Sequence, residues 1–132
     1  ELGVRLKRMG LRLVSADAAV GYHWHPAFTL DMLPALVSKE EARGRAAVVF
    51  LRKHPTLAVR LMVQMTTPQR LLWEGLTLGG GLDPLVLRIA ANRLAHGRPL
   101  LALALVRPIL NRYYVRAMYA ARRASPAPQG GR

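Results

Sequence analysis

Residues 98–124 read RPLLALALVRPILNRYYVRAMYAARRA, and this stretch decides the fold class. Pro99 suits the first position of a helix, where its missing N–H leaves no hydrogen bond unmade. The apolar residues that follow recur at helical spacing, which predicts one long helix, kinked near Pro108 and ending near Ala124. Its longest apolar run, residues 100–106, is far shorter than the roughly 20 residues that cross a bilayer, so we expect no membrane-spanning helix.

Helical signals continue upstream of that stretch. Thr29 can cap a first helix, and Ser38 begins a capping box, SKEE, that opens a second helix ending near Pro55. The two segments are alternatively one bent helix.

Two further helix starts are marked by a capping residue followed by Pro. These pairs are Thr67-Pro68 and Asp83-Pro84, and three glycines at 79–81 separate the helices that they begin. The glycines follow no strand and precede no Lys, so we interpret them as a linker and not as a phosphate loop.

The ends of two helices are marked by histidines. His54 precedes a helix-ending Pro and His96 precedes a Gly, so both are expected to cap helix C-termini. Residues 29–124 are therefore predicted to be all-α, and the Ser, Pro, Gln and Gly residues of 125–132 to form a disordered tail.

The first 28 residues carry a different pattern. Apolar residues at helical spacing predict a short amphipathic helix over 1–9, ended by Gly10. Residues 11–14 alternate like a strand, and 19–23 form a second extended run after a turn. The chain is thus expected to be an α-rich α/β fragment, in which a short helix-strand-turn-strand unit precedes an all-α helical tail.

The N-terminal residues also predict that the chain is a piece of a longer protein. ELGV, at 1–4, has no initiator Met, basic segment or hydrophobic leader. It resembles the middle of a helix, so we expect a fragment or a processed product.

Charge and composition restrict the classes of partner that the chain is expected to bind. The 132 residues include 20 Lys and Arg against 7 Asp and Glu, for a formal net charge of +13. Hydrophobic residues make up 52%, too many for a disordered polycation and enough for a packed core. Because 17 of the 20 basic residues are Arg, which pairs bidentately with phosphate, phosphate-bearing partners are expected first. The absence of Cys excludes disulfides, thiolate metal sites and thiol catalysis.

The densest polar and aromatic cluster is GYHWHP at 21–26. His23 and His25 lie two residues apart at an expected strand end, so their side chains would point to the same side and could hold a divalent metal or a phosphate. A packing or surface role for both imidazoles is the alternative. The seven acids are scattered, and the sequence shows no complete catalytic set.

Five motifs in the first 26 residues follow a known order. They are ELGVRL at 1–6, Gly10, Leu13-Val14, DAAV at 17–20 and HWHP at 23–26. This order resembles the last part of the catalytic domain of inverting family-two glycosyltransferases, which have the GT-A fold. The resemblance implies that residues 1–28 are the C-terminal end of a GT-A domain.

The resemblance also implies roles for particular residues. His23 matches a histidine that helps to hold a divalent metal, Mn or Mg, on the diphosphate of the nucleotide-sugar donor. Glu1 matches the acidic position beside the general base, which would fall two residues earlier. His25 is expected to take a phosphate-side cofactor role or a packing role. The parent enzyme would transfer a sugar to a hydroxyl of a glycan or lipid-linked acceptor with inversion, and this chain alone would be inactive.

The helical region has two interpretations. Its Arg residues border apolar stripes, which suits amphipathic helices on an anionic membrane, at the cytoplasmic inner face of the plasma membrane. The same helices could instead pack on a catalytic core. A non-enzymatic, basic, membrane-peripheral module is the first alternative function. A helical nucleic-acid binder is the second, but only charge favours it, so no nucleic-acid partner is expected.

Overall fold

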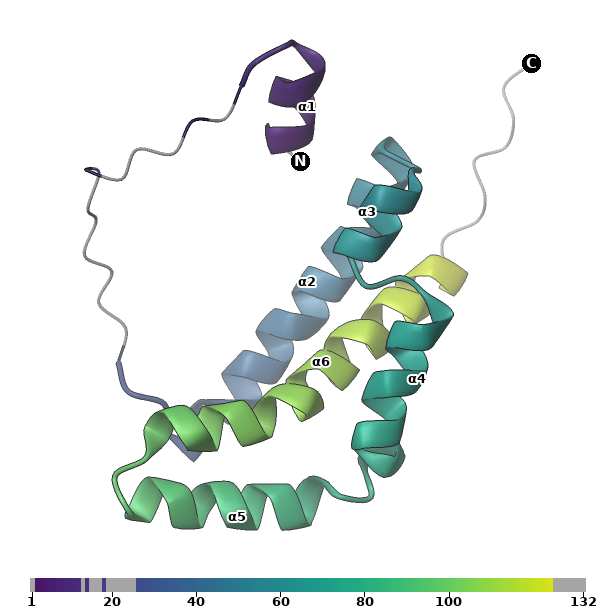
Figure 1. Cartoon of the computed structure of the whole chain (residues 1–132). Helices are drawn as coiled ribbons and strands as arrows, with labels where there is room; N and C mark the ends of the chain where they lie inside the picture. Colours follow the sequence, from purple (N-terminus) through teal and green to yellow (C-terminus); the bar gives the residue numbers. More distant parts are fainter. Residues whose placement is uncertain (1, 13, 15–17, 19–25, 125–132) are drawn as a thin grey trace.

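Helix α6 is the element on which the other long helices pack (Figure 1). The structure is a computed structural model that describes residues 2–12, 14, 18 and 26–124. In order along the chain, the elements are α1 (Leu2–Arg8), the 3₁₀ turn η1 (Leu30–Met32), α2 (Leu33–Lys53), α3 (Leu57–Met62), α4 (Thr67–Leu76), the 3₁₀ turn η2 (Leu78–Gly80), α5 (Asp83–Ala95) and α6 (Pro99–Ala124). Helices α2, α4 and α5 all contact α6.

The described residues form two apolar clusters, one around each half of α6. The first half of α6 packs against α5 and the chain before η1, with these buried residues: Phe28, Ala90, Ala102, Val106 and Leu110. The second half packs against α2 and α3, and its cluster consists of Ala47, Val48, Val59, Val63, Met65, Tyr114, Val115 and Met118. Because α6 has apolar side chains on opposite faces, it buries more of its circumference than a surface helix does.

The expectation of strands near the N-terminus is wrong for the part of the chain that the structure describes, and the α/β fold class is corrected to all-α. Leu11, Arg12 and Val14 lie outside any strand, and the side chains of Leu11 and Val14 are exposed. A strand needs a neighbour for its backbone N–H and C=O groups, and alternation alone supplies none. The second expected strand, 19–23, lies outside the described residues.

The predicted end of the first helix is confirmed. Gly10 has a φ of 78°, the left-handed conformation that glycine adopts without strain. The Gly10 N–H bonds to the Lys7 carbonyl and the Leu11 N–H to the Leu6 carbonyl, at 3.1 and 3.0 Å. These two bonds form a Schellman motif, which satisfies carbonyls that a helix end leaves unpaired.

Helix α2 bears out the alternative that the two predicted segments form one helix, and it corrects the helix start predicted at Ser38. It is one helix preceded by a 3₁₀ turn, so the capping box at Ser38 lies inside it and caps nothing. The apolar side chains on both sides of Ser38 pack on α6 or beside it, and this packing outweighs the local capping signal. The helix ends at His54, as expected from Pro55.

Three other boundaries differ from expectation or were missed. Helix α4 is capped by Thr66 rather than Thr67, and the Thr66 hydroxyl accepts the Gln69 N–H at 3.4 Å. Asp83 is the first residue of α5 and not its cap. Helix α3 is capped by Thr56, but its six residues are too few to show a clear period in the sequence. Helix α6 runs from Pro99 to Ala124 as expected, and it bends along its length in Figure 1, with Pro108 inside it.

Among the described helices, none has both the length and the hydropathy that a membrane span requires.

Gly44 sets how closely α2 approaches α6. A Cβ atom at this position would overlap the Tyr114 carbonyl oxygen and lie 3.0 Å from the Met118 nitrogen. Both are backbone atoms of a packed helix, so they cannot turn aside as a side chain would.

We expect Gly44→Ala to lower the free energy of unfolding by about 1–3 kcal/mol, because the helices must separate to admit the methyl group. Gly75→Ala is the matched control, since a Cβ there meets nothing within 4 Å and Ala favours a helix over Gly. Urea unfolding followed by circular dichroism measures both variants. Equal or greater stability of Gly44→Ala would show that α2 and α6 are not in close contact here.

Candidate functional site

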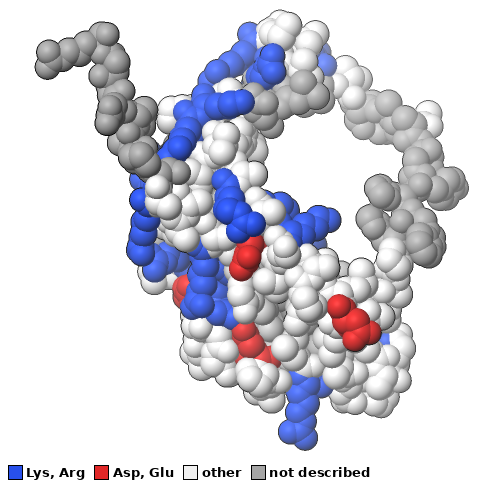
Figure 2. All heavy atoms as spheres, turned by 180° about the vertical axis from the view of Figure 1, so that it is seen from behind, with Lys and Arg blue, Asp and Glu red and all other residues white. Residues whose placement is uncertain are grey.

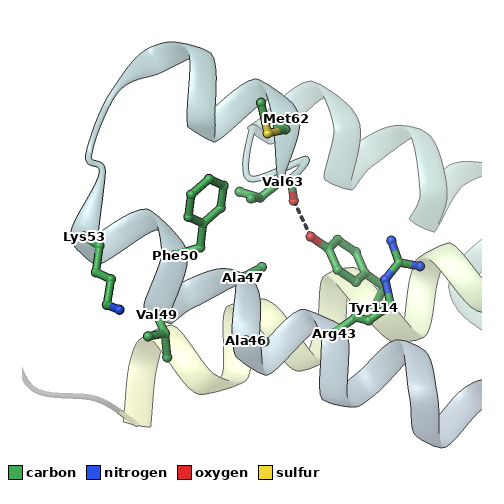
Figure 3. Close-up of a pocket in the computed structure, with 9 residues that line it drawn as sticks. All are labelled: Arg43, Ala46, Ala47, Val49, Phe50, Lys53, Met62, Val63 and Tyr114. Atoms are coloured by element: carbon green, nitrogen blue, oxygen red, sulfur yellow. Dashed lines mark hydrogen bonds between the residues drawn. The ribbon is translucent and has the colours of Figure 1, made fainter. Parts of the chain in front are cut away.

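A groove of about 590 Å³ lies between α2, α3 and α6 (Figure 3). It is lined by Arg43, Ala46, Ala47, Val49, Phe50, Lys53, Met62, Val63 and Tyr114. Ala46 and Ala47 leave room on α2 because their side chains are small, and Phe50 points toward α3. The volume falls within the range of small-molecule sites, which is roughly 300–1,000 Å³.

The floor of the groove is apolar and fixed. Ala47, Val63 and Tyr114 are buried, and the Tyr114 hydroxyl donates a hydrogen bond of 2.9 Å to the Val63 carbonyl. Burial raises the pKa of Tyr114 above its ordinary value, against the opposing effect of Arg43, so this phenol stays protonated and keeps its donor role. The bond ties α6 to the end of α3 and holds the floor in place.

The rim of the groove combines exposed apolar side chains with two cations. Val49 and Met62 are exposed by 55% and 65%. Arg43 holds both carboxylate oxygens of Glu40 at 2.7 Å, and its guanidinium carbon lies 5.6 Å from the centre of the Tyr114 ring. Lys53 stands ten residues further along α2, about 15 Å away on a straight helix. The groove therefore has an apolar floor, with Lys53 and the Glu40-paired Arg43 on its rim.

This chemistry suits binding rather than catalysis. The residues that line the groove include no carboxylate, imidazole or nucleophilic hydroxyl or thiol beyond the protonated Tyr114. An apolar chain that carries an anionic group would match it, because the chain would cover the apolar floor while the anionic group meets a cation.

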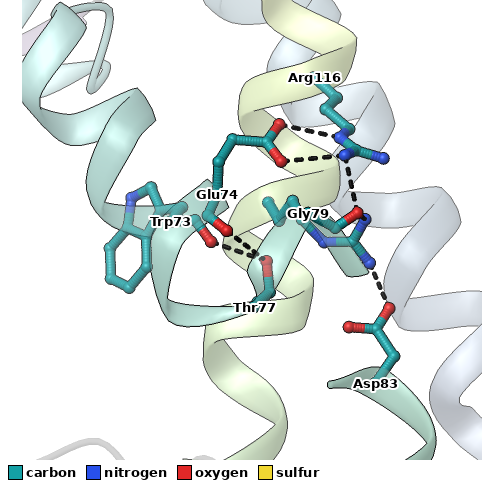
Figure 4. A network of polar contacts seen from close by, with 7 residues as sticks. Trp73, Glu74, Thr77, Gly79, Asp83 and Arg116 are labelled. Carbon is teal, nitrogen blue, oxygen red and sulfur yellow. Dashed lines mark hydrogen bonds and ion pairs between the residues drawn. The ribbon is translucent and has the colours of Figure 1, made fainter. Parts of the chain in front are cut away.

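A network of polar contacts joins α6 to the turn between α4 and α5 (Figure 4). Arg112 is buried, and it donates to the Gly79 carbonyl at 3.1 Å and to the Asp83 carboxylate. Arg116 forms two hydrogen bonds of 2.9 Å to Glu74 and one of 3.0 Å to the Gly79 carbonyl. Two guanidiniums thus hold one carbonyl and fix the glycine-rich turn predicted as a linker.

The ion pair of Arg116 and Glu74 changes the titration of both groups. The hydrogen bonds from Arg116 hold the pKa of Glu74 below its ordinary value, and Glu74 raises the pKa of Arg116. A carboxylate whose pKa is lowered by folding stabilises the fold above its ordinary pKa and loses that contribution as the pH falls. Because both side chains are partly exposed, the effect is small.

Of the residues singled out in the sequence, His54 and His96 do not line this groove. Glu1, His23 and His25 lie outside the described residues. His54 caps α2 as expected but is buried, while His96 caps α5 with its Nδ1 2.7 Å from the Asn92 carbonyl oxygen. The described residues bring no three His, Asp or Glu side chains together, so they do not build a metal site.

The groove was missed in the sequence, although Tyr114 lies in the stretch 98–124 quoted there. Its partner lies far away along the chain, since Tyr114 and Val63 are 51 residues apart. A helical period shows which face of a helix is apolar but not which other helix covers it.

Comparison of the chain with protein-family models, curated proteins and solved structures gave no match.

Arg112→Ala should lower the free energy of unfolding by about 3–5 kcal/mol, because it leaves Asp83 partly buried without its cation. The matched control is Arg116→Ala, whose more exposed pair with Glu74 should contribute about 1 kcal/mol or less. Thermal and urea unfolding of the two variants measures the difference. If both lose the same stability, the buried pair does not fix the turn.

Proposed function

We propose that this chain is the C-terminal part of an inverting family-two glycosyltransferase, an enzyme that moves a sugar from a nucleoside diphosphate to a hydroxyl acceptor. The observation that carries the proposal is the order of motifs in residues 1–26, which ends in HWHP at 23–26. The helix over Leu2–Arg8 and the left-handed Gly10 agree with that order. The proposal rests on residue identities and not on the strands that were expected after Gly10.

Sugar transfer requires a base, groups that orient the acceptor and positive charge at the leaving diphosphate. The acceptor oxygen bonds to the anomeric carbon while the bond from that carbon to the diphosphate breaks, and the acceptor proton passes to a carboxylate base. By the resemblance, that base lies two residues before Glu1, and Glu1 would orient the helix or the acceptor beside it. His23 is a candidate ligand for a divalent metal, which would supply positive charge to the leaving diphosphate when bound.

In this proposal, the helical region would bind the acceptor and would contact the membrane surface. The groove between α2, α3 and α6 has the shape and polarity for the apolar part of a lipid-linked acceptor. On the face shown in Figure 2, Lys and Arg side chains outnumber Asp and Glu and gather toward one side of the molecule. Such a surface is attracted to anionic lipid, which fits a cytoplasmic enzyme peripheral to the inner face of the plasma membrane.

A membrane-peripheral module without enzymatic activity is the second candidate. It is favoured by the exposed apolar side chains of α3, where Leu57, Leu61 and Met62 are exposed by 69%, 52% and 65% beside the basic residue Arg60. Apolar and basic side chains together on one short helix suit insertion at a lipid headgroup layer. The exposed apolar and basic side chains of α3 agree with either function, so a measurement of sugar transfer must distinguish the two.

The test is sugar transfer by the longer protein that contains these residues. We expect it to move sugar from a nucleoside-diphosphate donor to a hydroxyl acceptor with inversion, detected by release of the nucleoside diphosphate and by NMR of the product. His23→Ala should lower the transfer rate about a hundredfold or more, because charge stabilisation of the leaving group is lost.

His96→Ala is the matched control, since His96 is exposed and bonds only within its own helix end. We expect it to change the rate by about twofold or less. Equal losses in both variants would remove His23 from the site. Absence of transfer from any nucleoside-diphosphate sugar, together with binding to anionic vesicles, would favour the non-enzymatic module.

A further inference from the structure

A second, smaller pocket lies on another side of α6, between α6 and α4. Its volume is about 260 Å³. Helix α4 contributes Arg70 and Glu74, and α6 contributes Arg116, Tyr119, Ala120 and Arg123. Three guanidiniums therefore border one small space together with a single carboxylate.

The charges in this pocket do not balance. Both oxygens of Glu74 accept hydrogen bonds from Arg116, through its Nε and Nη2 atoms at 2.9 Å. Arg116 Nη2 also reaches the Gly79 carbonyl, which leaves the Nη1 donors of Arg116 without an assigned acceptor in the described residues. Arg70 and Arg123 form no hydrogen bond or ion pair with the described part of the chain. The pocket thus has an excess of two positive charges and several N–H groups that can donate.

One ring contact and the positions of the residues along α6 place these side chains around the space. The guanidinium carbon of Arg70 lies 5.1 Å from the centre of the Tyr119 ring, so a cation–π contact positions it while its N–H groups stay available. Arg116, Ala120 and Arg123 are at positions i, i+4 and i+7, so they share one face of α6. The Ala120 side chain is small, and it leaves the space open between the two arginines.

The electrostatic surroundings agree with this charge excess. Arg116, Arg112 and Arg70 all favour the ionised form of Glu74, and they hold the pKa of its carboxyl below the ordinary value. Like charges that border one pocket repel one another, so an anion that enters the pocket relieves that repulsion.

Size and geometry restrict the ligand. The pocket is smaller than the roughly 300 Å³ at which sites for drug-sized molecules begin, so it suits one compact group. A phosphate carries up to two negative charges near neutral pH, which matches the excess of two. Its oxygens also fit the planar fork of a guanidinium bidentately. A monovalent carboxylate would leave one of the positive charges unmatched.

We propose that the pocket formed by Arg70, Arg116 and Arg123 between α4 and α6 binds a phosphate group, from a free phosphate or diphosphate or from a phosphomonoester lipid headgroup. This site is independent of the proposed sugar transfer, since it uses no residue before α4. Arg70 and Arg123 would supply the hydrogen bonds that the anion gains, while Arg116 holds Glu74 away from them.

The test titrates the chain with inorganic phosphate and with pyrophosphate at low ionic strength, followed by calorimetry and by NMR shifts of Ala120 and Tyr119. We expect saturable binding with shifts confined to α4 and the C-terminal half of α6. Arg70→Gln and Arg123→Gln should each weaken it about tenfold or more, since each removes charge-assisted hydrogen bonds.

Arg88→Gln on α5 is the matched control, because it removes the same charge from an exposed residue outside the pocket. It should weaken binding about twofold or less. Thermal unfolding of each variant establishes that it is folded. A loss in Arg88→Gln equal to that in Arg123→Gln would overturn the proposal, because attraction to the overall charge would then explain the binding.

Vesicles distinguish the source of the phosphate. Phosphatidylcholine vesicles with and without phosphatidic acid are floated with the wild-type chain and with Arg123→Gln. A loss of phosphatidic-acid-dependent flotation in Arg123→Gln, but not in Arg88→Gln, would support the lipid headgroup as the ligand. Saturable binding of the free ions without such flotation would support the free ligand. If neither the ions nor the vesicles bind in a way that depends on Arg70 and Arg123, the proposal is wrong.

Discussion

Close contact between α2 and α6 at Gly44 is the constraint on which the rest of the helical region depends. The absence of a side chain brings the α2 backbone against α6 at Tyr114 and Met118. That distance allows Ala47 and Val48 to reach the same cluster as Met118, which is fully buried. It also sets the depth of the groove beside Tyr114. Small residues also lie at the contact between α6 and α5, where Ala90 and Ala102 are both fully buried.

Helix ends were predictable where a Gly or Pro has a strong local conformational preference. Gly10 ends α1, Pro55 follows the end of α2, and Pro99 begins α6. Prediction failed where the outcome depends on distant partners. Alternation after Gly10 suggested a strand, but no described strand lies beside it, and the capping box at Ser38 yielded to packing on α6. Local signals state a preference, and tertiary contacts decide whether it is realised.

The candidate sites were less predictable than the helices. The sequence pointed to histidines near the N-terminus, whereas the groove and the arginine pocket are built from helices α2, α3, α4 and α6. Asp83 looked like a helix cap, and only the structure shows that it pairs with Arg112, 29 residues away. Arginines that look alike in the sequence separate into buried, paired and pocket-lining residues once α6 is placed. The excess of positive charge was visible in the composition, but its concentration around Ala120 was not.

Two faces of α6 border different sites: an apolar groove toward α2 and α3 and a basic pocket toward α4. Residues of α6 line both the groove and the pocket, so amide hydrogen exchange measured by NMR tests the account most directly. The slowest amides should lie in α6 between Ile109 and Met118 and in α2 around Ala47, with α3 exchanging much faster. Exchange of those α6 amides as fast as those of α3 would show that α6 does not organise this fold.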